Sequence, residues 1–78
     1  MSKRKRYPWV WITRDRGCDF VEIWAPEAKP VFDGLYWNHP AEASLDIQCV
    51  EAFAAVMHWA PPPGTRWKVW FGFEAEEE

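Results

Sequence analysis

Hydrophobic positions are concentrated in three parts of the chain, and each of these predicts a β-strand whose successive side chains point to opposite faces. Residues 8–14 (PWVWITR) and 18–25 (CDFVEIWA) are rich in β-branched and aromatic residues, and the RDRG stretch between them has turn chemistry. Together they predict a hairpin. Residues 65–73 (TRWKVWFGF) carry the most regular alternation and predict the last strand.

The segment after the hairpin is harder to interpret, because prolines and a glycine interrupt it. Two prolines in PEAKP break the pattern at residues 26–30. Residues 31–38 (VFDGLYWN) are apolar apart from the polar Asp33-Gly34 pair near their centre. We expect this segment to form a short strand, a bulged edge strand, or both.

One helix is predicted between about Ser44 and His58. Asp46 is the expected N-cap, with Ser44 as the alternative, and the prolines of APPPG end the helix. At 100° per residue, one broad apolar face collects five side chains, which are Cys49, Val50, Phe53, Val56 and Met57.

The order strand, strand, short strand, helix, strand predicts an α+β fold. We expect a small, mostly antiparallel sheet of three or four strands with one helix packed on one face. A chain of 78 residues has room for one domain. The charged ends set its expected boundaries: a disordered basic arm at 1–6, the domain at 7–74 and an acidic tail at 75–78.

The last strand indicates which side of the sheet faces the helix. One set of its alternate residues is wholly apolar, namely Trp67, Val69, Phe71 and Phe73, and this set is expected to pack against the helix. In the second strand a carboxylate such as Glu22 would be costly inside, so its neighbours Val21 and Ile23 face the helix. The same chemistry places Val10 and Ile12 inside. The predicted core comprises Val10, Ile12, Val21, Ile23, Val50, Phe53, Met57, Trp67, Val69 and Phe71.

The opposite, outer face of the sheet is then also aromatic, and it is the predicted partner-binding surface. Its members are Trp9, Trp11, Phe20, Trp24 and Trp70, with Arg66 and Lys68 at the rim. Exposed apolar patches of several hundred Å² mark interaction sites, and Trp and Arg are enriched among interface hot spots. Two outcomes stay open: the face is exposed, or residues 26–38 fold across it and bury it. The in/out assignment of the first strand could also be reversed.

The cysteines and the charge pattern indicate a cytoplasmic protein. Cys18 and Cys49 are too few for the disulfide framework of a small secreted domain, and the apolar run after KRKR is too short for a signal sequence. No stretch reaches the length needed to cross a bilayer. We expect two reduced thiols, with Cys49 acting as a small apolar residue of the helix.

The sequence predicts no catalytic residue, no metal site and no cofactor. The four soft ligands (Cys18, His39, Cys49, His58) lack the spacing of a zinc site, and on a helix Cys49 and His58 would point to opposite sides. No nucleophile elbow or Gly-rich phosphate loop is present. We therefore expect a protein that is not an enzyme.

The motifs VWITRD, VEIW, KP and LYW, spread over residues 9–37, resemble a pattern of small bacteriophage and prophage proteins. In those proteins a W-I-x-R-D strand is followed by a short hydrophobic strand, then by K-P and a Trp or Tyr. They have no assigned activity. The resemblance implies an accessory phage product in the cytoplasm of a bacterial host, which acts by binding a host or phage protein.

Three functional readings follow from the aromatic face. The first is a protein–protein interaction module that inhibits a host or defence factor by occupying its surface. The second is a single-stranded nucleic-acid binder, in which the same Trp residues stack bases beside Arg and Lys. The third is a homodimer that uses this face for self-association. The acidic net charge of −3 disfavours the second.

Overall fold

The computed structural model describes residues 9–70 and 74–78. This part of the chain forms seven strands and one helix, which confirms the α+β class. In chain order the elements are β1 (Trp9–Arg14), β2 (Phe20–Trp24), β3 (Val31–Phe32), β4 (Trp37–Asn38), β5 (Asp46–Cys49), α1 (Val50–Met57), β6 (Arg66–Trp70) and β7 (Glu74–Glu77).

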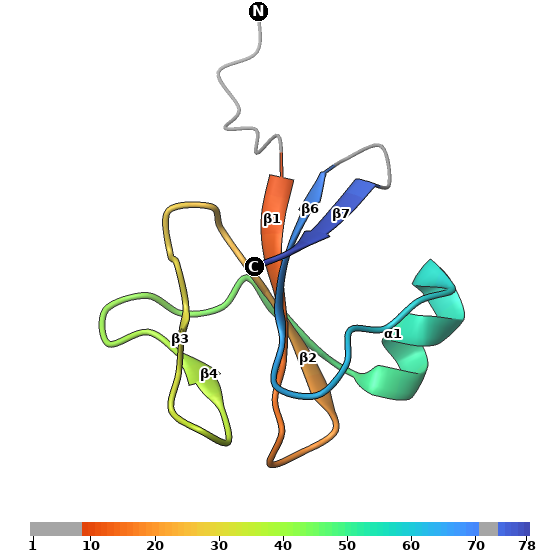
Figure 1. Cartoon of the computed structure of the whole chain (residues 1–78), viewed down its shortest axis with the longest axis horizontal. Coiled ribbons are helices and arrows are strands. Elements are labelled where there is room, and N and C mark those ends of the chain that lie inside the picture. The colour runs from red at the N-terminus through yellow and green to blue at the C-terminus, as the bar shows by residue number, and fades with distance from the viewer. Residues whose placement is uncertain (1–8, 71–73) are drawn as a thin grey trace, which may run out of the picture.

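The main sheet has five antiparallel strands in the order β5-β2-β1-β6-β7, and β3 and β4 form a separate two-stranded hairpin. The helix lies on one side of the main sheet and the β3–β4 hairpin on the other (Figure 1). The sheet is therefore wider than the three or four strands expected, and each of its faces has its own cover.

The predicted hairpin over residues 8–25 is confirmed by the β1–β2 register, in which Ile12 pairs with Ile23 and Trp11 with Trp24. On its other side β1 pairs with β6, opposite Trp67 and Val69. Directly paired side chains share a face of the sheet. The apolar β-branched residues of β1 and β2 therefore lie on one side and the tryptophans on the other.

The inner face, under α1, holds an apolar core. Five of the residues predicted for it are buried there: Val10, Ile12, Val21, Phe53 and Val69. Four more are partly buried and pack against that cluster, namely Ile23, Val50, Met57 and Trp67. The tenth, Phe71, lies outside the described residues. Trp59, which follows the helix, adds an edge-on contact with Trp67 at 5.3 Å between ring centroids.

The helix begins later than predicted, because residues 46–49 form strand β5. Asp46 is not an N-cap: it pairs with Ile23 of β2, and Cys49 precedes the helix with extended backbone angles and no side-chain cap bond. Cys49 is exposed and Val56 is 74 % exposed, so their expected place on the apolar helix face is wrong. His58 ends the helix in the left-handed conformation, before the proline run.

The acidic C-terminus also differs from expectation. Residues 75–78 were expected to form a polar tail, but Glu74–Glu77 is strand β7 and pairs with β6 along its length. Lys68 lies opposite Glu76 in this register, an opposite-charge pair that favours the alignment. The expected basic arm at 1–6 lies outside the described residues.

Candidate functional site

The middle of the outer face is covered by residues 25–38, called the flap here, which include the β3–β4 hairpin. Trp11 and Trp24 are 2 % and 3 % exposed, and Ala28 of the flap is buried against them. Both indole N–H groups have acceptors: Trp11 donates to the carbonyl of Pro26 at 2.9 Å and Trp24 to Thr13 Oγ1 at 3.0 Å. Trp11 and Trp24 are therefore core residues: of the two outcomes left open by the sequence, residues 26–38 fold across this part of the face and bury it.

Hydrogen bonds from the sheet hold the far end of the flap. The Trp37 N–H donates to Oδ1 of the buried Asp15 at 2.7 Å, and its indole N–H donates to the carbonyl of Arg14 at 3.1 Å. The carbonyl of Leu35 accepts the N–H groups of Arg16 and Gly17. These bonds join the β3–β4 turn to the β1–β2 turn, so the flap is anchored where the two hairpins meet.

The two rim cations predicted for the binding face lie over indole rings of the molecule itself. Arg66 is 4.4 Å from the Trp11 ring centroid and 5.7 Å from that of Trp37, and its Nη1 donates to the carbonyl of Pro30. Lys68 lies 5.0 Å from the Trp9 centroid and 5.5 Å from that of Trp11. Such contacts stabilise by about 0.5–2 kcal/mol each. Arg66 thus joins the flap to the sheet, whereas Lys68 packs on two rings of β1.

Trp9 and Trp70 lie at the edge of this cation–aromatic array and are half-buried. Their ring centroids are 6.3 Å apart, and the Trp9 ring meets Trp11 edge-on at 5.0 Å. Of the four tryptophans predicted for the outer face, only Trp9 and Trp70 therefore remain partly exposed, and they lie beside Lys68. The paired Glu76 of β7 lies on the same face as this lysine.

Asp15, which bonds to Trp37 of the flap, and Glu22 form a pair of neighbouring carboxyl groups. Burial, the neighbouring Asp15 carboxylate and a hydrogen bond to it raise the pKa of Glu22 to about 7. Its Oε1 is buried with no hydrogen-bond partner among the described residues. The Cys18 thiol donates to Asp15 Oδ2 at 3.5 Å, and burial together with Asp15 raises the pKa of that thiol as well.

One part of the outer face stays open, on β2 and the edge strand β5. Phe20, Leu45 and Ile47 are 44 %, 54 % and 53 % exposed, and these three side chains are called the apolar patch here. Ile47 pairs with Glu22, which places it on the same face as Phe20. Leu45 directly precedes β5, and its N–H donates to the carbonyl of Ile23 at 2.7 Å. Of the predicted partner-binding residues, Phe20 is the most exposed.

Leu45 and Ile47 were missed because residues 44–58 were interpreted as one helix. The signal was present in the sequence LDIQC, in which apolar and polar residues alternate over five positions. That period of two is typical of a strand, and here it places Ile47 and Cys49 on one face of β5. An exposed edge strand was thereby overlooked.

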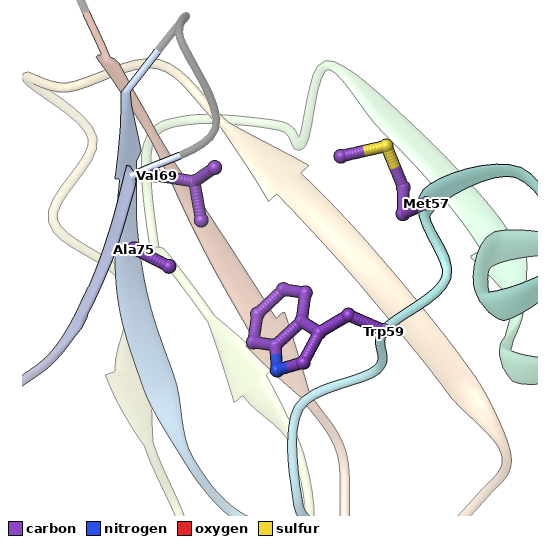
Figure 2. A pocket seen from close by; sticks show the side chains of 4 residues that line it. All are labelled: Met57, Trp59, Val69 and Ala75. Atoms are coloured by element: carbon purple, nitrogen blue, oxygen red, sulfur yellow. The ribbon is translucent and has the colours of Figure 1, made fainter.

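A small pocket lies on the inner face, where the end of α1 meets β6 and β7. Met57, Trp59, Val69 and Ala75 line a volume of about 200 Å³, and their side chains point toward one another across it (Figure 2). The lining is apolar and carries no titratable group, and the volume is below the roughly 300–1,000 Å³ of ligand sites. We therefore assign no binding role to it.

Within residues 9–70 and 74–78, no three His, Cys, Asp or Glu side chains are grouped closely enough to hold a metal ion. The one helix of this part is too short to cross a membrane. No family model, curated protein or solved structure matches the chain.

Proposed function

We propose that the protein is a protein–protein interaction module that binds its partner through the apolar patch of Phe20, Leu45 and Ile47. The observation that supports this is the exposure of these three large side chains, about half of each, on one side of β2 and β5. Apolar side chains gathered on the surface of a small protein are typical of interaction sites. The function is thus the one predicted from the aromatic face, moved to the part of that face that the flap leaves open.

The nucleic-acid alternative receives less support from the same geometry. Stacking of bases needs exposed rings beside free cations. Trp11 and Trp24 are buried, and both Arg66 and Lys68 are placed over indole rings. The origin in a phage or prophage and a role against a host factor remain predictions that this structure does not address.

The experiment uses a photo-crosslinking amino acid, introduced at position 47 in one variant and at position 56 in another. Val56 is the matched control, since it is an exposed apolar residue on α1, on the opposite side of the sheet (Figure 1). A protein that is captured from a bacterial lysate at position 47 but not at 56 is then produced in pure form and titrated against the wild type, Ile47→Ser and Val56→Ser.

We expect Ile47→Ser to weaken binding by about tenfold or more, as loss of a central apolar contact does, and Val56→Ser to leave it unchanged. If the captured protein binds Ile47→Ser as tightly as the wild type, or if position 47 captures nothing that position 56 does not, the proposal is wrong.

A further inference from the structure

We propose that Asp15 and Glu22 form a pH-sensitive latch for the flap: a proton held between the two carboxyl groups keeps the flap closed, and loss of that proton lets it lift from the outer face. The latch controls access to Trp11 and Trp24, which are almost fully buried beneath the closed flap. This inference does not depend on the proposed function, because no side chain of the apolar patch belongs to the latch.

The two carboxyl groups lie on the face of the sheet that the flap covers. Glu22 pairs with Thr13 and so shares its face, and Asp15 is two positions further along the chain, which returns its side chain to that face. The Asp15 N–H donates to the carbonyl of Phe20 at 3.4 Å, so the two segments still run side by side here. Asp15 and Glu22 are thus diagonal neighbours on the outer face.

Asp15 is the point at which the far end of the flap is held. It is 5 % exposed, and its Oδ1 accepts the Trp37 N–H at 2.7 Å. Its Oδ2 accepts the Cys18 thiol at 3.5 Å. A hydrogen bond between the two carboxyl groups raises the pKa of Glu22, so protonated Glu22 is the donor and Asp15 the acceptor. The buried carboxylate is therefore stabilised by donors of which one carries a removable proton.

Loss of the Glu22 proton replaces a donor with a second negative charge. Two carboxylates in contact repel each other, and both are costly to keep away from water. Glu22 Oε1 is buried and has no hydrogen-bond partner in the described part of the chain, so no donor is in place to receive the new charge. Asp15 is shielded from solvent while Trp37 is bound to it. Lifting the flap admits water to both carboxylates.

The cations that share this face are held over indole rings. Arg66 of β6 pairs with Thr13 and lies in the same row as Glu22, but its guanidinium lies 4.4 Å from the centroid of the Trp11 ring. Lys68 of the same strand lies 5.5 Å from the centroid of that ring. Asp15 is the charged group that acts on the pKa of Glu22.

The other elements around Glu22 bring no neutralising charge to it. Strand β5 presents Ile47 opposite Glu22. Arg14 pairs with Val21 and so faces the other side of the sheet, and its Nη2 lies 3.5 Å from Asp19. The flap carries Glu27 and Lys29 on either side of Ala28, which packs on the two tryptophans, and Asp33, which accepts N–H groups of its own turn.

The direction of the effect follows from which state holds the proton. The pKa of Glu22 is about 7 with the flap closed, against an ordinary value of 4.5 for an exposed carboxyl group. Between these values the closed state keeps a proton that the open state has released, so rising pH favours opening, and the effect levels off above about pH 7. Because Glu22 is only partly buried, we expect a change of about fivefold in the opening equilibrium.

The test follows hydrogen exchange of the Trp11 and Trp24 indole N–H groups by NMR from about pH 5 to pH 8. Each rate is divided by that of N-acetyltryptophanamide at the same pH, which removes the intrinsic pH dependence of exchange. Glu22→Gln keeps a donor that does not ionise. Glu51→Gln is the matched control, since it removes an exposed carboxylate on α1, on the other side of the sheet (Figure 1).

Every series is repeated in about 1 M urea, because urea promotes only those openings that expose a large surface. We expect the protection of both indoles to fall about fivefold from pH 5 to pH 8 in the wild type and in Glu51→Gln, with little effect of urea. In Glu22→Gln the protection should stay constant.

Three results would overturn the latch. Constant protection in the wild type would mean that Glu22 turns toward solvent while the flap stays closed. An equal fall in Glu22→Gln would place the titrating group elsewhere. A fall that depends on urea as steeply as the exchange of the β1 and β2 backbone amides would show unfolding of the whole sheet. The wild-type series decides the first and third of these without any variant, so the test does not require Glu22→Gln to fold.

Discussion

The outer face of the sheet contains two regions with the same sequence pattern and opposite surroundings. In the middle, Trp11 and Trp24 are almost fully buried beneath the flap, whereas Phe20 and Ile47, on the same face, are about half exposed. Alternation decides which side of a sheet a residue occupies, but it does not decide whether that side is covered. The cover comes from residues 25–38, and its reach determines which apolar side chains belong to the core and which remain available.

Truncation in the covered region should have the largest effect on stability. We expect Trp24→Ala to lower the free energy of unfolding by about 3–5 kcal/mol, because it leaves a cavity beneath the flap and removes the donor to Thr13 Oγ1. Native stabilities are about 5–15 kcal/mol, so this variant would be close to unfolding. Urea denaturation followed by circular dichroism measures the difference, and a loss of under 1 kcal/mol would show that the flap does not pack as described.

Loss of the hydrogen bond between Trp37 and Asp15, which anchors the flap, should have the second-largest effect on stability. Asp15→Ala removes the acceptor of the Trp37 N–H and leaves that donor without a partner, for a loss of about 2 kcal/mol. Asp15→Asn keeps an oxygen acceptor and serves as the matched control, with a smaller loss. Equal stabilities for the two variants in the same denaturation assay would argue against this hydrogen bond as the anchor.

The free energy of unfolding should depend on pH through Glu22, whose carboxyl group lies beside Asp15. Its pKa is raised to about 7 from an ordinary value of 4.5, so between these values the folded protein holds a proton that the unfolded chain has released. The stability that this group contributes is full below about pH 4.5 and is lost as the pH rises through 7. Asp15 is the titratable group that acts on Glu22, and Glu22 in turn helps to raise the pKa of the Cys18 thiol.

Glu22→Gln should remove that dependence. Relative to this variant, the wild type should lose about 1 kcal/mol between pH 5 and pH 8, a figure reduced to allow for the partial exposure of Glu22 to solvent. Denaturation at a series of pH values checks the slope. A wild type that gains stability over the same interval relative to Glu22→Gln would contradict the sign.

The open region should show the smallest effect on stability. Ile47→Ser should cost about 1 kcal/mol or less, because the side chain is half exposed and contributes chiefly strand propensity and limited packing. Trp24→Ala should cost far more, although both residues are large, apolar and on one face of the sheet, because only Trp24 is covered by the flap. A loss of 3 kcal/mol or more in thermal or urea unfolding would place Ile47 in the core.

The parts of the fold that alternation governs could be predicted from the sequence. The β1–β2 hairpin and β6 follow from Val10, Ile12 and Val69, whose neighbours on either side point to the other face. The start of the helix could not be fixed, because Leu45, Ile47 and Cys49 fit the end of a strand and Cys49 also fits a helical face. Pairing with β2 decided it in favour of a strand.

The position of the flap and the strand β7 depend on contacts between residues far apart in the chain. Asp15 and Trp37 are separated by 22 positions and Arg66 and Pro30 by 36, and no local pattern indicates that they meet. Strand β7 is almost entirely Glu, a residue depleted in strands, and it forms because β6 offers an edge with Lys68 opposite Glu76. The candidate site lies at Ile47 and not at Trp11 and Trp24, because the flap, which is held by these distant contacts, covers the two tryptophans.

Hydrogen exchange at the indole N–H groups, followed by NMR, tests most directly whether the flap closes the middle of the outer face. Trp11 and Trp24 donate to acceptors in a buried setting, whereas Trp9 and Trp70 lie at its margin. We expect the indole protons of Trp11 and Trp24 to exchange at least about a hundred times more slowly than those of Trp9 and Trp70. Equally fast exchange at all four would mean that the flap is open and that the whole aromatic face, rather than the apolar patch alone, is available to a partner.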